Sequence, residues 1–184
     1  MLRYAGTDAL SVYGIIVNIS TIVQCCAYSV GQAAQPIFSI NYGARQWDRI
    51  RETLRYALRT AALFSLVWTA VALAVPNGFI RLFMSPTEHV LAIAPTIIRR
   101  YCLSFLLLPL NVFSTYYFQS LLRPGASFGV SVARGLGVSG ILIFLLPAAF
   151  GGDAMWFAMP ITELLVAGAV VVMMIRYTKA LEKL

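Results

Sequence analysis

The chain has 184 residues, of which 60% are hydrophobic and only 11% are charged, and its mean hydropathy is +0.80. A soluble domain needs far less apolar material to fill one core, so this composition indicates an integral membrane protein. The net charge of +7 comes almost entirely from arginine and is expected to mark membrane orientation, which excludes nucleic acid as the expected partner.

The first predicted membrane span covers residues 10–38, after a short external loop at residues 1–9 that lacks the pattern of a signal peptide. The span is longer than a hydrocarbon core of about 30 Å requires, so we expect it to tilt, project or bend, with one bend at Pro36. Polar residues follow one side of this helix at about 100° per residue. They are Asn18, Thr21, Cys25, Tyr28, Gln32 and Gln35. Because such a stripe is costly against lipid, it should face either other helices or a water-filled cavity.

A helix stop follows at Asn41-Tyr42-Gly43, since Asn and Gly both tolerate positive φ. From Trp47 onward an arginine-rich amphipathic helix is predicted to lie at the membrane interface. It leads into the second span, residues 56–75, which ends at Pro76-Asn77-Gly78.

The next helix is predicted to start with Ser85 as its N-cap and Glu88 completing a capping box. Residues 86–100 should form an external lead-in that is kinked at Pro95 and carries the interfacial His89. The third span then covers residues 101–121, with a second bend at Pro109. Its polar residues share a face and form a second candidate cavity wall. They are Ser104, Asn111, Ser114, Thr115 and Gln119.

A tight turn at Arg123-Pro124-Gly125 predicts that the fourth span, residues 127–148, runs antiparallel to the third. Small residues recur at every fourth position of this span, which predicts close approach by a neighbouring backbone. The fifth span covers residues 154–175, after the turn at Gly151-Gly152-Asp153.

Two charges lie within these last two spans. Arg134 is expected to snorkel toward the basic end of its helix, the alternative being a fixed charge in a cavity. Glu163 is a functional candidate, because a carboxylate at that depth must be protonated, paired or hydrated. The alternative is a bonded packing residue near the outer interface.

Five spans divide the basic residues unequally between the two sides, ten against four. The basic side is expected to be cytoplasmic, which makes the protein a multi-pass plasma-membrane protein with a cytoplasmic C-terminus. The N-terminus would lie outside, an unusual start that suggests a fragment. The ten residues are Arg45, Arg49, Arg51, Arg55, Arg59, Arg123, Arg134, Arg176, Lys179 and Lys183, and the four are Arg3, Arg81, Arg99 and Arg100.

Two stretches resemble a known family. Gly31-x-x-x-Gln35-Pro36, then Asn41-Tyr42-Gly43-Ala44 and Tyr56-Ala57, is similar to the end of the second helix in the C-terminal lobe of multidrug and toxic compound extrusion (MATE) antiporters. Tyr117-Phe118-Gln119 is similar to the end of their tenth helix, although Arg123-Pro124 replaces the more usual short glycine turn. The resemblance covers nearly the whole chain, residues 1–184, and implies an all-α membrane helix bundle equivalent to helices eight to twelve of twelve.

The resemblance further implies a secondary transporter with two lobes around a central cavity. It would export organic cations or amphipathic drugs by alternating access in exchange for H⁺ or Na⁺. Its partners would be membrane lipid and the missing N-terminal lobe. In branches of the family a coupling carboxylate lies in the first helix, or in the seventh and tenth. The third span offers Asn111, Ser114 and Gln119 instead, so the coupling ion is expected mainly outside this chain, and no metal or organic cofactor is expected.

Three alternatives stand beside this hypothesis. A flippase of the same superfamily that carries a lipid-linked glycan precursor would need several cavity arginines, and only Arg134 is a candidate. A membrane-embedded enzyme would need paired aspartates, an activated serine or clustered metal ligands, whereas the spans hold one Glu and no Asp or His, so no enzyme activity is expected. The third alternative is a truncated remnant that does not transport.

Overall fold

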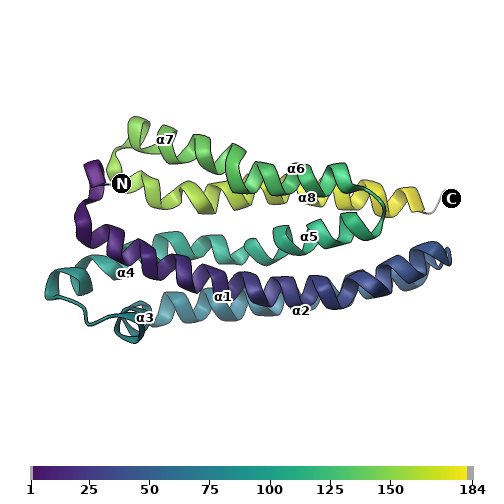
Figure 1. Cartoon of the computed structure of the whole chain (residues 1–184), viewed down its shortest axis with the longest axis horizontal. Helices are drawn as coiled ribbons and strands as arrows, with labels where there is room; N and C mark the ends of the chain where they lie inside the picture. Colours follow the sequence, from purple (N-terminus) through teal and green to yellow (C-terminus); the bar gives the residue numbers. More distant parts are fainter. Residues whose placement is uncertain (1, 182–184) are drawn as a thin grey trace.

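The structure is a computed structural model that describes residues 2–181, with side chains from residue 8 onward. It is a helix bundle whose long helices lie side by side and are connected at the two ends (Figure 1). Five stretches are long and apolar enough to cross a membrane, which confirms the predicted all-α fold class. The elements are α1 (Leu2–Gly43), α2 (Trp47–Ala74), α3 (Pro76–Phe83), α4 (Glu88–Cys102), η1 (Leu103–Leu106), α5 (Leu108–Ser120), α6 (Pro124–Val132), η2 (Ala133–Gly137), α7 (Val138–Phe150), η3 (Gly152–Phe157) and α8 (Ala158–Ala180).

Helix α1 is longer than predicted at both ends. The external loop expected at residues 1–9 is wrong, because the helix begins at Leu2. Its early part is held by the bundle: Ala9 is buried and the Asp8 carboxylate contacts His89 Nδ1 of α4 at 2.7 Å. At the other end the helix continues through Gly43, and the residue with positive φ is Arg45, at 55°.

The predicted interfacial helix runs directly into the second span. Trp47–Ala74 forms one continuous helix of 28 residues, because no proline or glycine interrupts the change from its arginine-rich start to its apolar end. The helix stops before Pro76, which occupies the first turn of the short helix α3, where a missing backbone N–H costs nothing.

The third span is built from two helices rather than from a lead-in and a span. Thr87, not Ser85, caps α4, because its hydroxyl accepts the Val90 N–H at 3.3 Å. The chain passes Pro95 without leaving the helix and breaks instead at the 3₁₀ turn η1. Pro109 cannot donate to the carbonyl four residues earlier, that of Phe105, and the Ser65 hydroxyl of α2 donates to this oxygen at 3.0 Å.

The last two spans are antiparallel as predicted, and the chain reverses between them at Gly151, whose φ is 88°. The predicted close packing of small residues in the fourth span is wrong for the described residues. A Cβ added at Gly125, Gly129 or Gly135 would meet nothing within 4 Å. The close approach occurs at Gly31 of α1, where a Cβ would overlap the Tyr116 ring.

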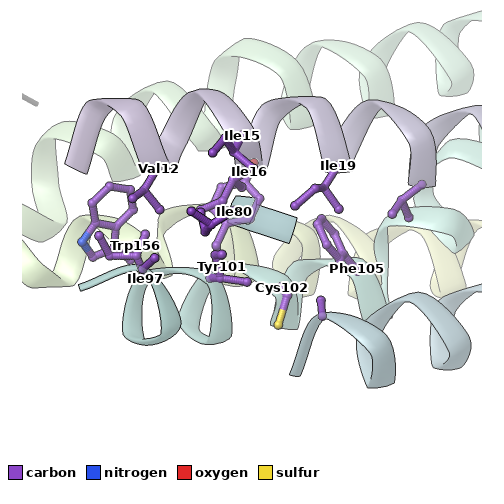
Figure 2. Packing of buried hydrophobic residues seen from close by; sticks show 14 of the residues in the cluster. Val12, Ile15, Ile16, Ile19, Ile80, Ile97, Tyr101, Cys102, Phe105 and Trp156 are labelled. Atoms are coloured by element: carbon purple, nitrogen blue, oxygen red, sulfur yellow. The ribbon is translucent and has the colours of Figure 1, made fainter. Parts of the chain in front are cut away.

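Two apolar clusters fill the bundle, one toward each end. The first joins α1, α4, η1 and η3 through residues such as Ile16, Tyr101 and Trp156 (Figure 2). The second includes Phe38 and Tyr117, whose rings meet edge to face with centroids 5.1 Å apart. The clusters meet on α5 between Val112 and Phe113, so the preceding residue, Asn111, lies at their boundary.

Candidate functional site

A buried ion pair joins the fourth and fifth spans. Arg134 Nε donates to Glu163 Oε1 at 2.6 Å; the Glu163 side chain has no exposed surface and the Arg134 side chain is 17% exposed. The expected snorkelling of Arg134 is therefore wrong. The reason is that Glu163 offers a charged partner inside the bundle, and two desolvated charges are tolerable only when paired.

Asn111 of α5 completes the arrangement. Its Nδ2 donates to Glu163 Oε2 at 2.6 Å and to the Glu163 carbonyl at 2.9 Å, while its own Oδ1 is buried without a hydrogen-bond partner. Each carboxylate oxygen thus accepts one N–H. We call Asn111, Arg134 and Glu163 the charged triad; it ties together three separate helical elements, α5, η2 and α8.

The backbone under Arg134 is unusual. Residues Ala133–Gly137 form a π-helical turn that interrupts the fourth span. Such turns are rare and occur frequently at functional sites, because they re-aim the side chains around them. Gly135 and Gly137 are compatible with the wider turn, but no feature of the sequence predicted it.

A tyrosine and a serine extend the polar contacts toward α1. Tyr101 of α4 is 7% exposed and lies beside Ser20 of α1. The Ser20 hydroxyl is buried and has no partner within hydrogen-bonding geometry. Sequence reasoning missed both residues, because a Tyr and a Ser among apolar neighbours are ordinary in a helical span.

The polar stripe predicted on α1 faces away from the bundle. Asn18, Thr21, Cys25, Tyr28 and Gln32 are exposed, and Gln35 is half-buried. The hydrogen bonds of two members stay within α1, from Thr21 Oγ1 to the Val17 carbonyl at 2.9 Å and from the Tyr28 hydroxyl to Gln24 Oε1 at 3.4 Å. We call these six residues the α1 polar stripe.

The second predicted wall, on α5, is only partly exposed. Asn111 and Ser114 are fully buried, so the expectation that they line a cavity is wrong. The reason is that α5 is the central helix and packs against α1, α2, α6 and α8. Ser114 donates to the Asn111 carbonyl at 2.7 Å. Gln119 is exposed and donates to Ser127 Oγ at 3.0 Å.

Comparison with known proteins decides the family. A family model described as MatE matches residues 1–151. The chain belongs to the MatE family, the MATE transporters. No match to a curated protein reaches significance.

Solved MATE structures share the fold of this chain. An outward-facing multidrug resistance MATE transporter of the MOP superfamily aligns with a TM-score of 0.90 and 16% identity, over 100% of this chain and 41% of that chain. The MATE multidrug transporter DinF-BH, in complex with R6G, aligns with a TM-score of 0.81 and 27% identity, over 95% of this chain and 39% of that chain. A MOP superfamily transporter from Pyrococcus furiosus Vc1 aligns with a TM-score of 0.88 and 16% identity, over 100% of this chain and 41% of that chain. The chain therefore spans about two fifths of the length of these transporters.

The MATE-like motif residues lie at the end of α1 and serve local structure. Gly31 is buried against Tyr116, and Pro36 is exposed within the helix. Asn41 is buried and its Nδ2 donates to the Ile37 carbonyl at 2.8 Å, while Tyr42 packs edge-on against Trp47 at 5.8 Å. The last two, Gly43 and Ala44, are exposed at the turn into α2.

Proposed function

We propose that this chain forms helices eight to twelve, most of the C-terminal lobe, of a MATE transporter. The transporter exports organic cations or amphipathic small molecules by alternating access, in exchange for H⁺ or Na⁺. The observation that carries this proposal is the α1 polar stripe. It is exposed on a helix that is otherwise apolar enough to span a membrane.

The polar side chains of the stripe cost free energy wherever they face lipid, but not where they line a cavity or contact other helices. From Asn18 to Gln32 it extends about 21 Å at a rise of ~1.5 Å per residue, most of the thickness of a hydrocarbon core. Uncharged amides, hydroxyls and tyrosines over that length cannot face lipid cheaply. Tyr28 and Tyr116 meet edge to face at 6.3 Å beside the stripe, and aromatic faces of this kind attract cationic groups.

The rest of the cavity comes from helices outside this chain. The solved transporters are more than twice as long, and we assign the remaining helices to the partner lobe. Arg45 belongs to the α1–α2 connection and Arg123 to the α5–α6 connection, which lie at one end of the bundle, whereas Arg81 belongs to α3 at the other end (Figure 1). We assign the first end, with the C-terminus, to the cytoplasmic face of the plasma membrane.

Transport by the native gene product that contains this chain tests the proposal. The protein is reconstituted in liposomes and R6G movement is followed under an imposed pH gradient and, separately, under a Na⁺ gradient. We expect one of the two gradients to drive R6G accumulation. No movement under either gradient, with protein shown to be folded and inserted, would reject transport and favour the remnant.

The flippase alternative is not favoured by the geometry. It required cavity arginines, and Arg134, the one candidate, is paired with Glu163 inside the bundle. The same liposomes, loaded with a fluorescent lipid-linked sugar, provide the comparison, and we expect no cargo-dependent flipping.

A further inference from the structure

A groove lies between α2 and α8 on the surface of the bundle. Both helices pack on α5 but scarcely on each other, and a cavity of about 360 Å³ remains between them. Leu110 of α5 forms its floor. Leu54 and Leu58 of α2 line one side, and Val171 and Ile175 of α8 line the other. We call this space the α2–α8 groove, and its hydrocarbon lining requires an apolar occupant.

A hydroxyl group that lines the groove is already engaged within the chain. Thr178 Oγ1 donates to the Met174 carbonyl at 2.7 Å and lies 2.7 Å from the Tyr117 hydroxyl. Because the Thr178 hydroxyl has a single proton, the Tyr117 hydroxyl is the donor in the second bond. Thr178 therefore needs no polar partner from outside the chain.

One end of the groove is basic. Lys179 of α8 lines that end. On α2, Arg51 lies three residues before Leu54 and seven before Leu58, which places it on the same face of the helix, closer to the helix start. Arg55 lies one turn further along. The start of α2 and the end of α8 lie at the same end of the bundle (Figure 1), so the two helices bring these cations together.

The carboxylates of this part of α2 leave the groove end basic. Asp48 contacts Arg51 Nη1 at 3.5 Å, but the Asp48 side chain is fully exposed, and exposed pairs of this kind are weak and screened by salt. Glu52 lies two residues before Leu54, which places it about 200° around the helix from the groove. The end of the groove is therefore complementary to an anion such as a phosphate.

The length of the groove matches one leaflet of a bilayer. From Val171 to Lys179 it follows α8 for ~12 Å at a rise of ~1.5 Å per residue. One leaflet contributes ~15 Å of a hydrocarbon core that is ~30 Å thick. An acyl chain whose phosphate lies level with Lys179 would therefore run along the groove toward the middle of the membrane.

We propose that an anionic phospholipid binds in the α2–α8 groove, with one acyl chain in the groove and its phosphate beside Arg51, Arg55 and Lys179. The inference goes beyond transport and takes from the proposed function only the cytoplasmic assignment of the basic end. The cytoplasmic leaflet carries anionic lipids, and basic pockets between membrane helices bind their headgroups. A chain that leaves lipid for the groove gains little hydrophobic free energy. The cations therefore supply the affinity, and the groove fixes the position.

A helix of the partner lobe is a poorer occupant because of where the groove lies. The proposed function places that lobe against the α1 polar stripe. Helix α1 packs on another side of α2, where Thr53 and Ala57 line a separate groove that the two helices share. A lobe that covers the stripe therefore leaves the α2–α8 groove open to lipid.

Native mass spectrometry of the native gene product measures lipid binding without cargo or gradient. The delipidated protein is titrated in detergent with phosphatidylglycerol, which is anionic, and with phosphatidylcholine of the same acyl chains. We expect one phosphatidylglycerol to bind more tightly than any phosphatidylcholine. Each basic residue near the phosphate strengthens binding by about fivefold, so Arg51→Gln/Lys179→Gln should weaken the first phosphatidylglycerol by about 25-fold.

Two further variants separate the groove from general surface charge. Arg49→Gln/Arg59→Gln is the matched control, because it removes two arginines of α2 that the helical spacing turns away from Leu54 and Leu58. It should leave the affinity nearly unchanged. Val171→Trp fills the groove from its half-exposed side and keeps every cation, and it should also weaken phosphatidylglycerol binding. Thermal unfolding of each variant in detergent shows that it is folded.

Photolabelling in liposomes locates the bound lipid. Phosphatidylglycerol with a photoreactive acyl chain should label residues 171–179 of α8, and Val171→Trp should remove that label. Equal affinity for the two lipids, or an equal loss in the matched control, would overturn the inference. Tight binding with no label on α8 would show that another segment or a second copy covers the groove, which also overturns it. These readouts need no R6G transport, so failure of the proposed function would leave them decisive.

Discussion

Two polar regions of this membrane protein are satisfied in opposite ways. The charged triad lies at the centre of the bundle and finds its partners among the chain's own helices. The α1 polar stripe lies on the surface, where two of its side chains bond within their own helix. The difference shows that a polar residue in a span either bonds to other helices of the same chain or needs a polar partner outside the chain. The burial of the side chain distinguishes these two cases, whereas the residue type does not.

The sharpest way to break this comparison is to remove one charge of the triad. Arg134→Leu leaves Glu163 buried without its cation and should destabilise the protein by about 3–5 kcal/mol, the usual cost of an unpaired buried charge. Arg134→Leu/Glu163→Leu should recover most of the loss. Thermal unfolding in detergent measures both, and equal stability of the single variant and wild type would show that the pair is not desolvated.

The amide of the triad should matter less. Asn111→Ala removes the N–H donated to Glu163 Oε2 and to the Glu163 carbonyl, leaving both buried acceptors short of a partner. We expect a cost of about 1–3 kcal/mol. Ser114→Ala, one turn away and equally buried, is the control and should cost less, since it removes a single neutral hydrogen bond. A larger loss of stability in Ser114→Ala than in Asn111→Ala would contradict this prediction.

A buried glycine of α1 next to the stripe offers a packing test. Gly31→Ala must displace the Tyr116 ring and should cost about 1–3 kcal/mol, as overpacking of a filled core does. Gly129→Ala adds the same methyl group in open space and should be neutral or slightly stabilising, since alanine favours a helix. Thermal unfolding of the two variants side by side decides the matter.

The stripe itself should have the smallest effect on stability. Asn18→Leu/Gln32→Leu changes two exposed side chains, so unfolding should shift by no more than about 0.5 kcal/mol. Under the proposed function, R6G binding measured by fluorescence should weaken. Leu66→Ala, an exposed site on α2, is the control and should leave binding unchanged. A large loss of stability in the stripe variant would mean that these residues belong to the fold.

The sequence predicts the broad organisation well because it is carried by local signals. Apolar length marks the five spans, and Pro76 and Gly151 end helices for reasons of their own backbone chemistry. The third span stays helical through Pro95, where a kink was predicted, and its helix is interrupted at η1, just before the predicted bend at Pro109. A helix tolerates a proline where a neighbour bonds the carbonyl that the proline leaves free. For Pro109 this carbonyl is that of Phe105 in η1, and the Ser65 hydroxyl donates to it.

The triad could not be predicted, because its partners are aligned only by the tertiary structure. Counted from the basic end of each span, Arg134 lies about ten residues in and Glu163 about seventeen, a difference of ~10 Å along straight helices. With that offset, the sequence alone favours snorkelling of Arg134 over pairing with Glu163. The long arginine side chain closes the distance from a π-helical turn that no sequence signal announced.

The 3₁₀ turn between α4 and α5 has a mechanical consequence. The backbone ladder of the third span is already interrupted at Leu103–Leu107, and a side chain of another helix stands in for the missing donor. Bending at this point therefore breaks no regular helical bond. The third span therefore consists of two helices, α4 and α5, joined near mid-length by η1, and the Ser65 side chain of α2 holds this junction.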